Sequence, residues 1–237
     1  MKHTMKLFEI GLKQILKDGM LLVMVPAPFL AGLFFKLALP LINTILTDKF
    51  AFSITAWYGI ADGMLIALTP MFTAMISAFL LLEERDEGLN AFYQITPAQG
   101  YSYLTARVGL PMLWAFAITI IVLAAFNLSA LSPVDIISGA LIGSLTGIFL
   151  AMMVASIAGN RVEGLAVSKL MGISFIGLIL IWFIPAPYSY LMAFLPSFWI
   201  GKIMMDGTHF FSLIAGLICC LLWIGFFTRY FLKHQNN

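Results

Sequence analysis

The residue types that enzymes use for catalysis are scarce and scattered in this chain. Its three histidines, His3, His209 and His234, lie far apart, and no H-E-x-x-H motif occurs, so no metal site is indicated. There is no G-x-S-x-G motif either. The one Gly-Lys pair, Gly201–Lys202, lacks the preceding glycine-rich loop of a nucleotide-binding P-loop. We therefore expect the chain to have no catalytic site and no cofactor of its own.

One stretch does concentrate charge. Four of the eleven acidic residues of the chain, Glu83, Glu84, Asp86 and Glu87, occupy five positions. The sequence on either side is almost uncharged for about twenty residues. Carboxylates at the start of a helix interact favourably with the positive end of its dipole, and an aspartate is a good N-cap. The cluster therefore predicts a helix that begins at Asp86.

The residues after the cluster define one face of this predicted helix. Leu89, Phe92, Tyr93 and Thr96 follow one another at i, i+3, i+4 and i+7. Pro97 disfavours helical geometry at Thr96 and ends the element, which gives a helix over residues 86–96. Two interpretations remain open from the residues alone. The stretch is either a solvated loop whose aromatic side chains rest on lipid head groups, or a docking helix for a soluble partner with aromatic anchors inside a polar rim.

The medium around these residues follows from composition. Of the 237 residues, 62% are hydrophobic and 10% are charged, whereas soluble domains have about 25% charged residues. Too little polar surface is left to cover a soluble globule, so the chain is expected to lie in lipid. The net charge of +2 gives no indication of a nucleic-acid partner.

Six apolar runs are long enough to span a membrane, which takes about 20 residues. They cover Leu21–Ile45, Gly59–Leu82, Val108–Leu128, Ile136–Ala158, Leu165–Ile184 and Phe210–Phe231. The runs are continuous and do not alternate, which favours helices over a barrel. The fold class predicted is an all-α integral membrane protein with six transmembrane helices in a single domain over residues 1–237.

The orientation follows from the basic residues. With the N-terminus in the cytoplasm, ten of the thirteen Lys and Arg residues lie inside, and only Lys36, Lys49 and Lys202 lie outside. Both termini are then cytoplasmic. Tyr188–Met205 is apolar enough for a seventh span, but a crossing there would move the C-terminal Arg229 and Lys233 outside.

Two further elements complete the predicted architecture. Residues 186–209 are expected to form an outer re-entrant or interfacial hairpin, broken at Pro196, with its aromatic residues at the membrane interface. Residues 4–18 mix apolar residues with lysines, which predicts an amphipathic elbow helix at the membrane surface.

Ionisable residues within the spans are few. Asp62, Lys36 and Lys169 lie toward span ends, where long side chains reach water. An ion-coupled carrier commonly needs a buried acid or base, and Asp62 is the one plausible candidate. The alternative interpretation of Asp62 is a wetted acid at the outer mouth. Asp62 and Lys36 are kept as possible pathway residues.

The loop after the second span resembles that of the ABC-2 type permeases, the membrane subunits of one class of ATP-binding-cassette exporter. The resemblance rests on Glu84-x-x-Glu87-Gly88, then Thr96-Pro97, then Leu104 and Arg107. Six spans, an elbow helix before the first span, and a broken outer hairpin with the element "LPSFW" also fit that family, so the resemblance covers nearly the whole chain.

The resemblance implies an exporter subunit in the cell inner (plasma) membrane. It implies a second, identical or similar permease subunit and two copies of a separate ATPase that binds ATP and Mg²⁺. The helix at 86–96 would then be the coupling helix, docked on the ATPase through Leu89, Phe92 and Tyr93. Polar contacts around them would come from Glu83, Glu84 and Glu87. The implied cargo is hydrophobic or amphipathic. The alternatives from other classes are an ion-coupled secondary transporter and a membrane-embedded enzyme.

Overall fold

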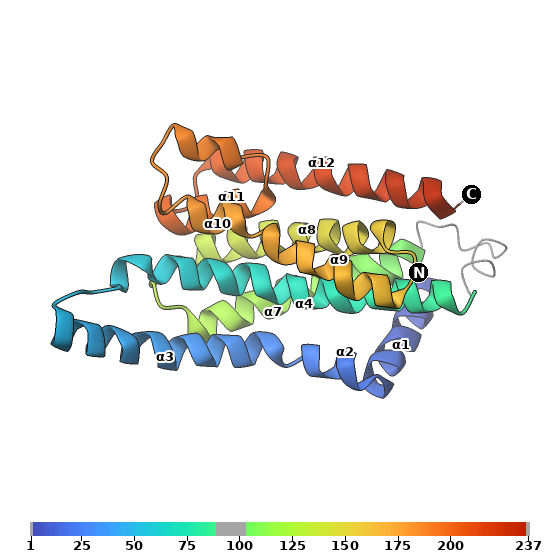
Figure 1. The fold of residues 1–237 in the computed structure, drawn as a ribbon. Helices are drawn as coiled ribbons and strands as arrows, with labels where there is room; N and C mark the ends of the chain where they lie inside the picture. Colours follow the sequence, from blue (N-terminus) through green and yellow to red (C-terminus); the bar gives the residue numbers. More distant parts are fainter. Residues whose placement is uncertain (1, 89–102, 236–237) are drawn as a thin grey trace.

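The structure is a computed structural model that describes residues 2–88 and 103–235 of the chain (Figure 1). These residues form helices, and no strand occurs among them. In chain order the helices are α1 (Lys2–Lys17), α2 (Gly19–Met24), α3 (Ala27–Phe50), η1 (Thr55–Trp57), α4 (Tyr58–Asp86), η2 (Thr105–Gly109), α7 (Leu110–Phe126), α8 (Pro133–Ile157), α9 (Arg161–Ile173), α10 (Ile176–Leu180), η3 (Tyr188–Met192), α11 (Pro196–Asp206) and α12 (Phe210–Gln235). The predicted all-α fold is confirmed.

Six helical segments of the described chain are long and apolar enough to cross a membrane. They are Gly19–Phe50, Thr55–Asp86, Thr105–Phe126, Pro133–Ile157, Arg161–Leu180 and Phe210–Lys233. Each contains most of one predicted run, so the count of six is confirmed. The first segment is five residues longer at its end than predicted, because α3 continues from Ile45 to Phe50 and stops at Ala51, which has a left-handed φ of 52°.

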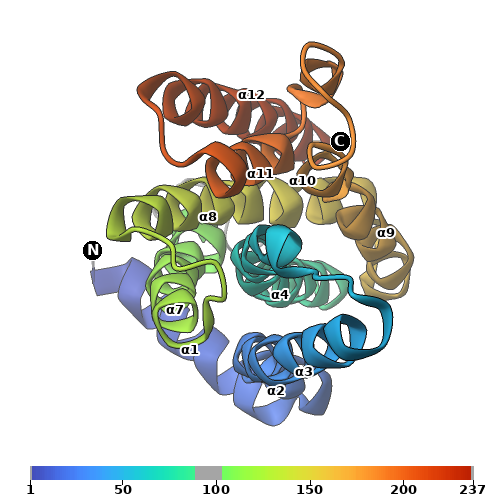
Figure 2. The same cartoon turned by 90° about the vertical axis from the view of Figure 1, so that its left-hand side faces the viewer.

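Two of the spans form the centre of the bundle. In Figure 2, α4 is surrounded by α3, α7, α8 and α9. Most of the apolar stretch of α4 (72%) and of α8 (78%) is buried, against 17–33% in the other four spans. Glycines at four-residue spacing let α8 approach α4: a Cβ on Gly143 would lie 2.8 Å from the Ile66 carbonyl, and one on Gly147 3.1 Å from that of Pro70. Such small-residue spacing is typical of close helix packing in membranes.

The two termini lie at the same end of the bundle as the end of α4 (Figure 1). An even number of spans requires this arrangement. The opposite end holds the connections 51–57 and 127–132 and the segment between α10 and α12. We call the end with the termini the ion-paired end, because the buried ion pair of Glu84 and Arg107 lies there.

The segment predicted as an outer hairpin contains η3 and α11. Pro196 is the first residue of α11, where its fixed φ and missing N–H are tolerated. With eleven residues, α11 is about 16 Å long and too short to cross a membrane. The expectation that its aromatic residues lie at the membrane interface stays a prediction, but Phe198 and Trp199 do not face lipid. Both are buried, because α11 packs against α8, α10 and α12.

Candidate functional site

The acidic cluster lies at the end of α4. Glu83, Glu84 and Asp86 belong to the last turns of this helix, and the chain turns at Gly88, whose φ is +69°. A glycine in this conformation commonly ends a helix. The prediction that Asp86 begins a new helix is therefore wrong. Its carboxylate instead accepts a hydrogen bond of 3.1 Å from the backbone N–H of Arg161, the first residue of α9.

The other part of the predicted coupling helix lies outside the described residues. This applies to Leu89, Phe92 and Tyr93, so their predicted docking role stays a prediction. Glu87 is exposed and Glu83 is partly exposed, so both can contact a partner.

A buried ion pair closes the base of this segment. Glu84 at the end of α4 and Arg107 in η2 are each 1% exposed and bonded to one another. Tyr103 donates a 2.6 Å hydrogen bond to Oε2 of Glu84, and Nη1 of Arg107 donates one of 3.0 Å to the carbonyl of Leu7 in α1. Buried charges need their lone pairs and protons satisfied, and this network satisfies them. The prediction that Glu84 contacts a partner at the surface is not compatible with this burial.

A second cluster lies around Arg161. Its guanidinium is paired with Asp18, the N-cap of α2, and lies 3.6 Å from Oε1 of Glu83. The hydrogen bond from Arg161 is the largest cause of the lowered pKa of Asp18, and the N–H groups of Leu21 and Met20 also lower it. The cluster therefore ties the start of α9 to the junction between α1 and α2 and to the end of α4.

The remaining cation of the acidic stretch caps another helix. Arg85 donates hydrogen bonds of 3.0 and 2.8 Å to the carbonyls of Ala155 and Ala158, at the end of α8. Cations at a helix C-terminus satisfy its last carbonyls. The elements on both sides of the 89–102 segment are thus held to the N-terminal helix α1 and, through α2, α8 and α9, to three further spans. Over the described ranges, no three His, Cys, Asp or Glu side chains are grouped to hold a metal ion.

Asp62 and Lys36 are not at this end of the bundle. Asp62 is fully buried and accepts hydrogen bonds from the N–H groups of Leu128 (2.9 Å) and Ser129 (2.8 Å) and from the Ser129 hydroxyl. A wetted acid was one interpretation of Asp62, and it is wrong, because the loop after α7 folds over the carboxylate. Lys36 is exposed and donates to the carbonyl of Ala125. Both side chains hold the end of α7.

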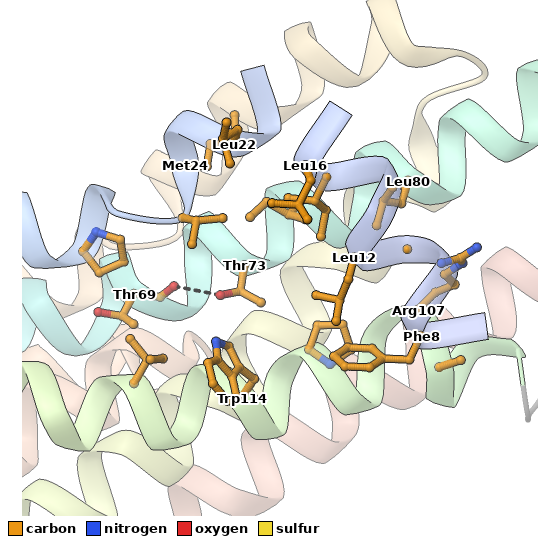
Figure 3. A pocket seen from close by; sticks show the side chains of 18 of the residues that line it. Phe8, Leu12, Leu16, Leu22, Met24, Thr69, Thr73, Leu80, Arg107 and Trp114 are labelled. Carbon is orange, nitrogen blue, oxygen red and sulfur yellow. Dashed lines mark hydrogen bonds between the residues drawn. The ribbon is translucent and has the colours of Figure 1, made fainter. Parts of the chain in front are cut away.

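A cavity of about 520 Å³ lies between α1 and the first three spans (Figure 3). Its lining includes Phe8, Leu12, Ile15 and Leu16 from α1, Leu22, Met24, Val25, Pro28 and Phe29 from α2 and α3, Thr69, Thr73, Ile76 and Leu80 from α4, and Ala106, Arg107, Pro111, Trp114 and Ile118 from η2 and α7. The apolar spacing of α1 was visible in the sequence, but it predicted a face resting on lipid. Nothing in the sequence indicated that other helices would meet this face to enclose a cavity.

The comparisons with known proteins agree with this architecture. A family model described as "Fluoroquinolones export permease protein Rv2686c-like" matches residues 11–228. The chain belongs to this family. Two relatives from Mycobacterium tuberculosis, the fluoroquinolones export permease proteins MT2760 (strain CDC 1551 / Oshkosh) and Rv2686c (strain ATCC 25618 / H37Rv), are each 25% identical to it. Each alignment runs over 230 residues, 92% of this chain and 90% of the relative.

Membership in this family confirms the recognition of the chain as a permease of the kind found in ABC-2 type exporters. With six helical segments of the described residues long and apolar enough to span a membrane, the chain is a multi-pass membrane protein. The matched range begins at Gly11, within α1, and ends within α12, so it includes α4, η2 and α7 but only the second half of α1.

Proposed function

We propose that this chain is the membrane subunit of an ATP-driven exporter in the cell inner (plasma) membrane, with both termini in the cytoplasm. Membership in a family of export permeases carries this proposal. The permease would act with a second permease subunit and two copies of a separate ATPase, which binds the ATP and Mg²⁺. Ten of the thirteen basic residues fall on the side of the membrane assigned to the cytoplasm, which supports the orientation.

The proposed docking element is the segment that follows α4. Leu89, Phe92 and Tyr93 would anchor it in the ATPase, and Glu83 and Glu87 would provide the polar rim. The buried pair of Glu84 and Arg107 supports this assignment, because it joins the two ends of the segment rigidly to the bundle. Movement of the ATPase would then be transmitted to α1, α4 and α7 together.

The proposed cargo is hydrophobic or amphipathic, and fluoroquinolones are candidates because the relatives are named for their export. An ion-coupled carrier is less favoured. Its candidate acid, Asp62, is already bonded to two backbone N–H groups and a hydroxyl, which leaves little capacity to bind and release an ion.

Co-purification with the ATPase tests the docking role. Phe92→Asp is expected to abolish the association and leave membrane insertion unchanged. Tyr188→Asp is the matched control, because Tyr188 is an exposed aromatic residue (68%) at the opposite end of the bundle. A Phe92→Asp complex that survives with full transport-coupled ATPase activity would show that this segment does not dock.

A further inference from the structure

The cavity between α1 and the spans has an apolar rim that faces away from the bundle. Leu12, Leu16, Leu22, Val25 and Trp114 all line it and are 43–67% exposed. On the flank of a multi-pass membrane protein, we expect such a rim to contact lipid tails. A molecule dissolved in the bilayer could then reach the cavity without passing through water.

The polar atoms of the cavity wall are hydrogen-bond acceptors. The hydroxyls of Thr69 and Thr73 donate to the carbonyls of Leu65 (2.9 Å) and Thr69 (3.3 Å), as Figure 3 shows for Thr73. Their lone pairs stay available, because a hydroxyl has one proton and two acceptor positions. Their intrahelical bonds thus turn both threonines into acceptors toward the cavity.

A backbone carbonyl beside the cavity lacks its usual helical donor. Pro28 has no N–H to donate to the carbonyl of Met24, four residues earlier, and both residues line the cavity. Within residues 2–88 and 103–235, no backbone N–H group donates to this carbonyl. A backbone group without a partner is unfavourable in lipid, so a donor on a bound molecule would be stabilised here.

The part of the cavity wall that the structure describes offers no free charge. Arg107 is the one ionised side chain among these described lining residues, and its guanidinium is already bonded to Glu84 and to the carbonyl of Leu7. A charged ligand would have to be desolvated without a counter-ion, which is strongly unfavourable. The fitting ligand is uncharged, largely apolar and carries a hydroxyl or N–H donor, so an ionisable cargo would have to enter in its neutral form.

We propose that this cavity takes up cargo from the bilayer, and that the cargo bound there is an uncharged amphipathic molecule with at least one hydrogen-bond donor. The inference rests on the proposed export function. The volume of about 520 Å³ is within the range of about 300–1,000 Å³ for sites that bind small molecules. Arg107 links the cavity to the proposed docking segment, because it lines the cavity and also forms the ion pair with Glu84 at the base of that segment.

Photolabelling of the permease alone tests the site. The probe is a diazirine-bearing octanol, which has an apolar chain, no charge and one hydroxyl. The chain in phosphatidylcholine vesicles is labelled, and the modified residues are located by mass spectrometry with and without excess octanol. We expect labelling of α1 and of Trp114 that octanol competes away, and labelling of the exposed Leu222 on α12 that it does not.

Three variants define the contacts. Combining Thr69→Val with Thr73→Val should weaken octanol competition by about fivefold or more, since one hydrogen bond contributes about 1 kcal/mol. Thr119→Val is the matched control. Its hydroxyl is buried and also bonds a carbonyl four residues earlier, that of Ala115, but Thr119 does not line the cavity. Leu12→Trp, at the exposed rim, should remove the competable labelling by filling the cavity.

Each outcome is decisive. Labelling of α1 that octanol does not compete away, or competition unchanged in both the double threonine variant and Leu12→Trp, would overturn the site. Stimulation of the ATPase by octanol in the reconstituted complex tests the cargo role. If octanol binds in the cavity but does not stimulate an ATPase that other cargo stimulates, the cavity is a lipid site. If no ATPase associates with the chain, the proposed function fails, while the labelling still reports on the site.

Discussion

Arg107 and Glu84 form an ion pair from which water is almost completely excluded, and the 22 residues between them include the whole 89–102 segment. Removing both charges from water is unfavourable, and their attraction compensates only when every remaining proton and lone pair is bonded. Tyr103 and the carbonyl of Leu7 supply two such bonds. The pair therefore fixes where the segment leaves and re-enters the bundle.

Loss of one partner of this pair should be severe. Glu84→Gln leaves the Arg107 charge buried without a counter-ion, so we expect the free energy of unfolding to fall by about 3–5 kcal/mol. Combining Glu84→Gln with Arg107→Met should recover most of this loss. Thermal unfolding in detergent measures the stability of the single and the double variant. Lys202→Met, which breaks the more exposed pair with Asp206, is the control and should change stability by about 1 kcal/mol or less.

The position of Arg107 depends on a glycine in α1. A Cβ added at Gly11 would overlap Nη1 of Arg107, so Gly11→Ala should displace the guanidinium and weaken its bond to Leu7. We expect a destabilised chain and faster proteolysis near the start of α1. Gly172→Ala is the matched control, since nothing lies within 4 Å of a Cβ there. Gly172 lies in α9, where alanine should leave the free energy of unfolding unchanged or raise it by up to about 1 kcal/mol. If the two variants had the same stability and the same rate of proteolysis, this role of Gly11 would be contradicted.

Acid should loosen the junction between α1 and α9. The pKa of Asp18 is lowered from 3.8 by the hydrogen bond from Arg161, so the ionised form is favoured in the folded chain. This stabilisation is complete above the ordinary pKa and is lost as the pH falls from about 4 through the lowered value. Hydrogen exchange of α1 between pH 7 and pH 3 measures the effect. Asp18→Asn keeps a good N-cap but has no charge, so it should abolish the pH dependence.

Asp62 provides a test of the energy source. Asp62→Asn keeps one oxygen that can accept a hydrogen bond, but it replaces the other oxygen with an NH₂ group. That group cannot accept from the N–H groups of Leu128 and Ser129. We expect a loss of stability of about 1–3 kcal/mol and transport that still follows ATP hydrolysis. An Asp62→Asn chain with wild-type unfolding and no transport would instead place Asp62 in the pathway and favour ion coupling.

The spans and their number could be predicted from the sequence because each run satisfies one physical condition, about 20 apolar residues in succession. The break at Pro196 could be predicted too, and the structure shows that α11 begins at this residue, because proline is favoured in the first turn of a helix. The end of α4 was not. Asp86 has the residue type of an N-cap, but Gly88 ends the preceding helix two residues later, and the partner of Asp86 is the distant Arg161.

The polar contacts of the site were beyond sequence reasoning for a related reason. Glu84 stands in an exposed-looking cluster, and its burial depends on Arg107, which is 23 positions away, and on Leu7, which is 77 positions away. Asp62 was predictable as an ionisable group at a span end, but not as the acceptor for the loop after α7. The burial of Glu84 and of Asp62 depends on contacts with distant segments of the chain. The spacing of residues along one helix does not indicate such contacts.

The unequal lengths of the first and third spans have a consequence for the surrounding membrane. At 1.5 Å per residue, the 30 helical residues of α2 and α3 amount to about 45 Å along their two axes and the 22 of Thr105–Phe126 to about 33 Å, against a hydrocarbon thickness of about 30 Å. Only 17% of the apolar stretch of the longer span is covered by protein. We expect the hydrophobic mismatch on that flank to be accommodated by tilt or by local thickening of the bilayer. Acyl-chain length is therefore an external variable to which the first span is expected to respond.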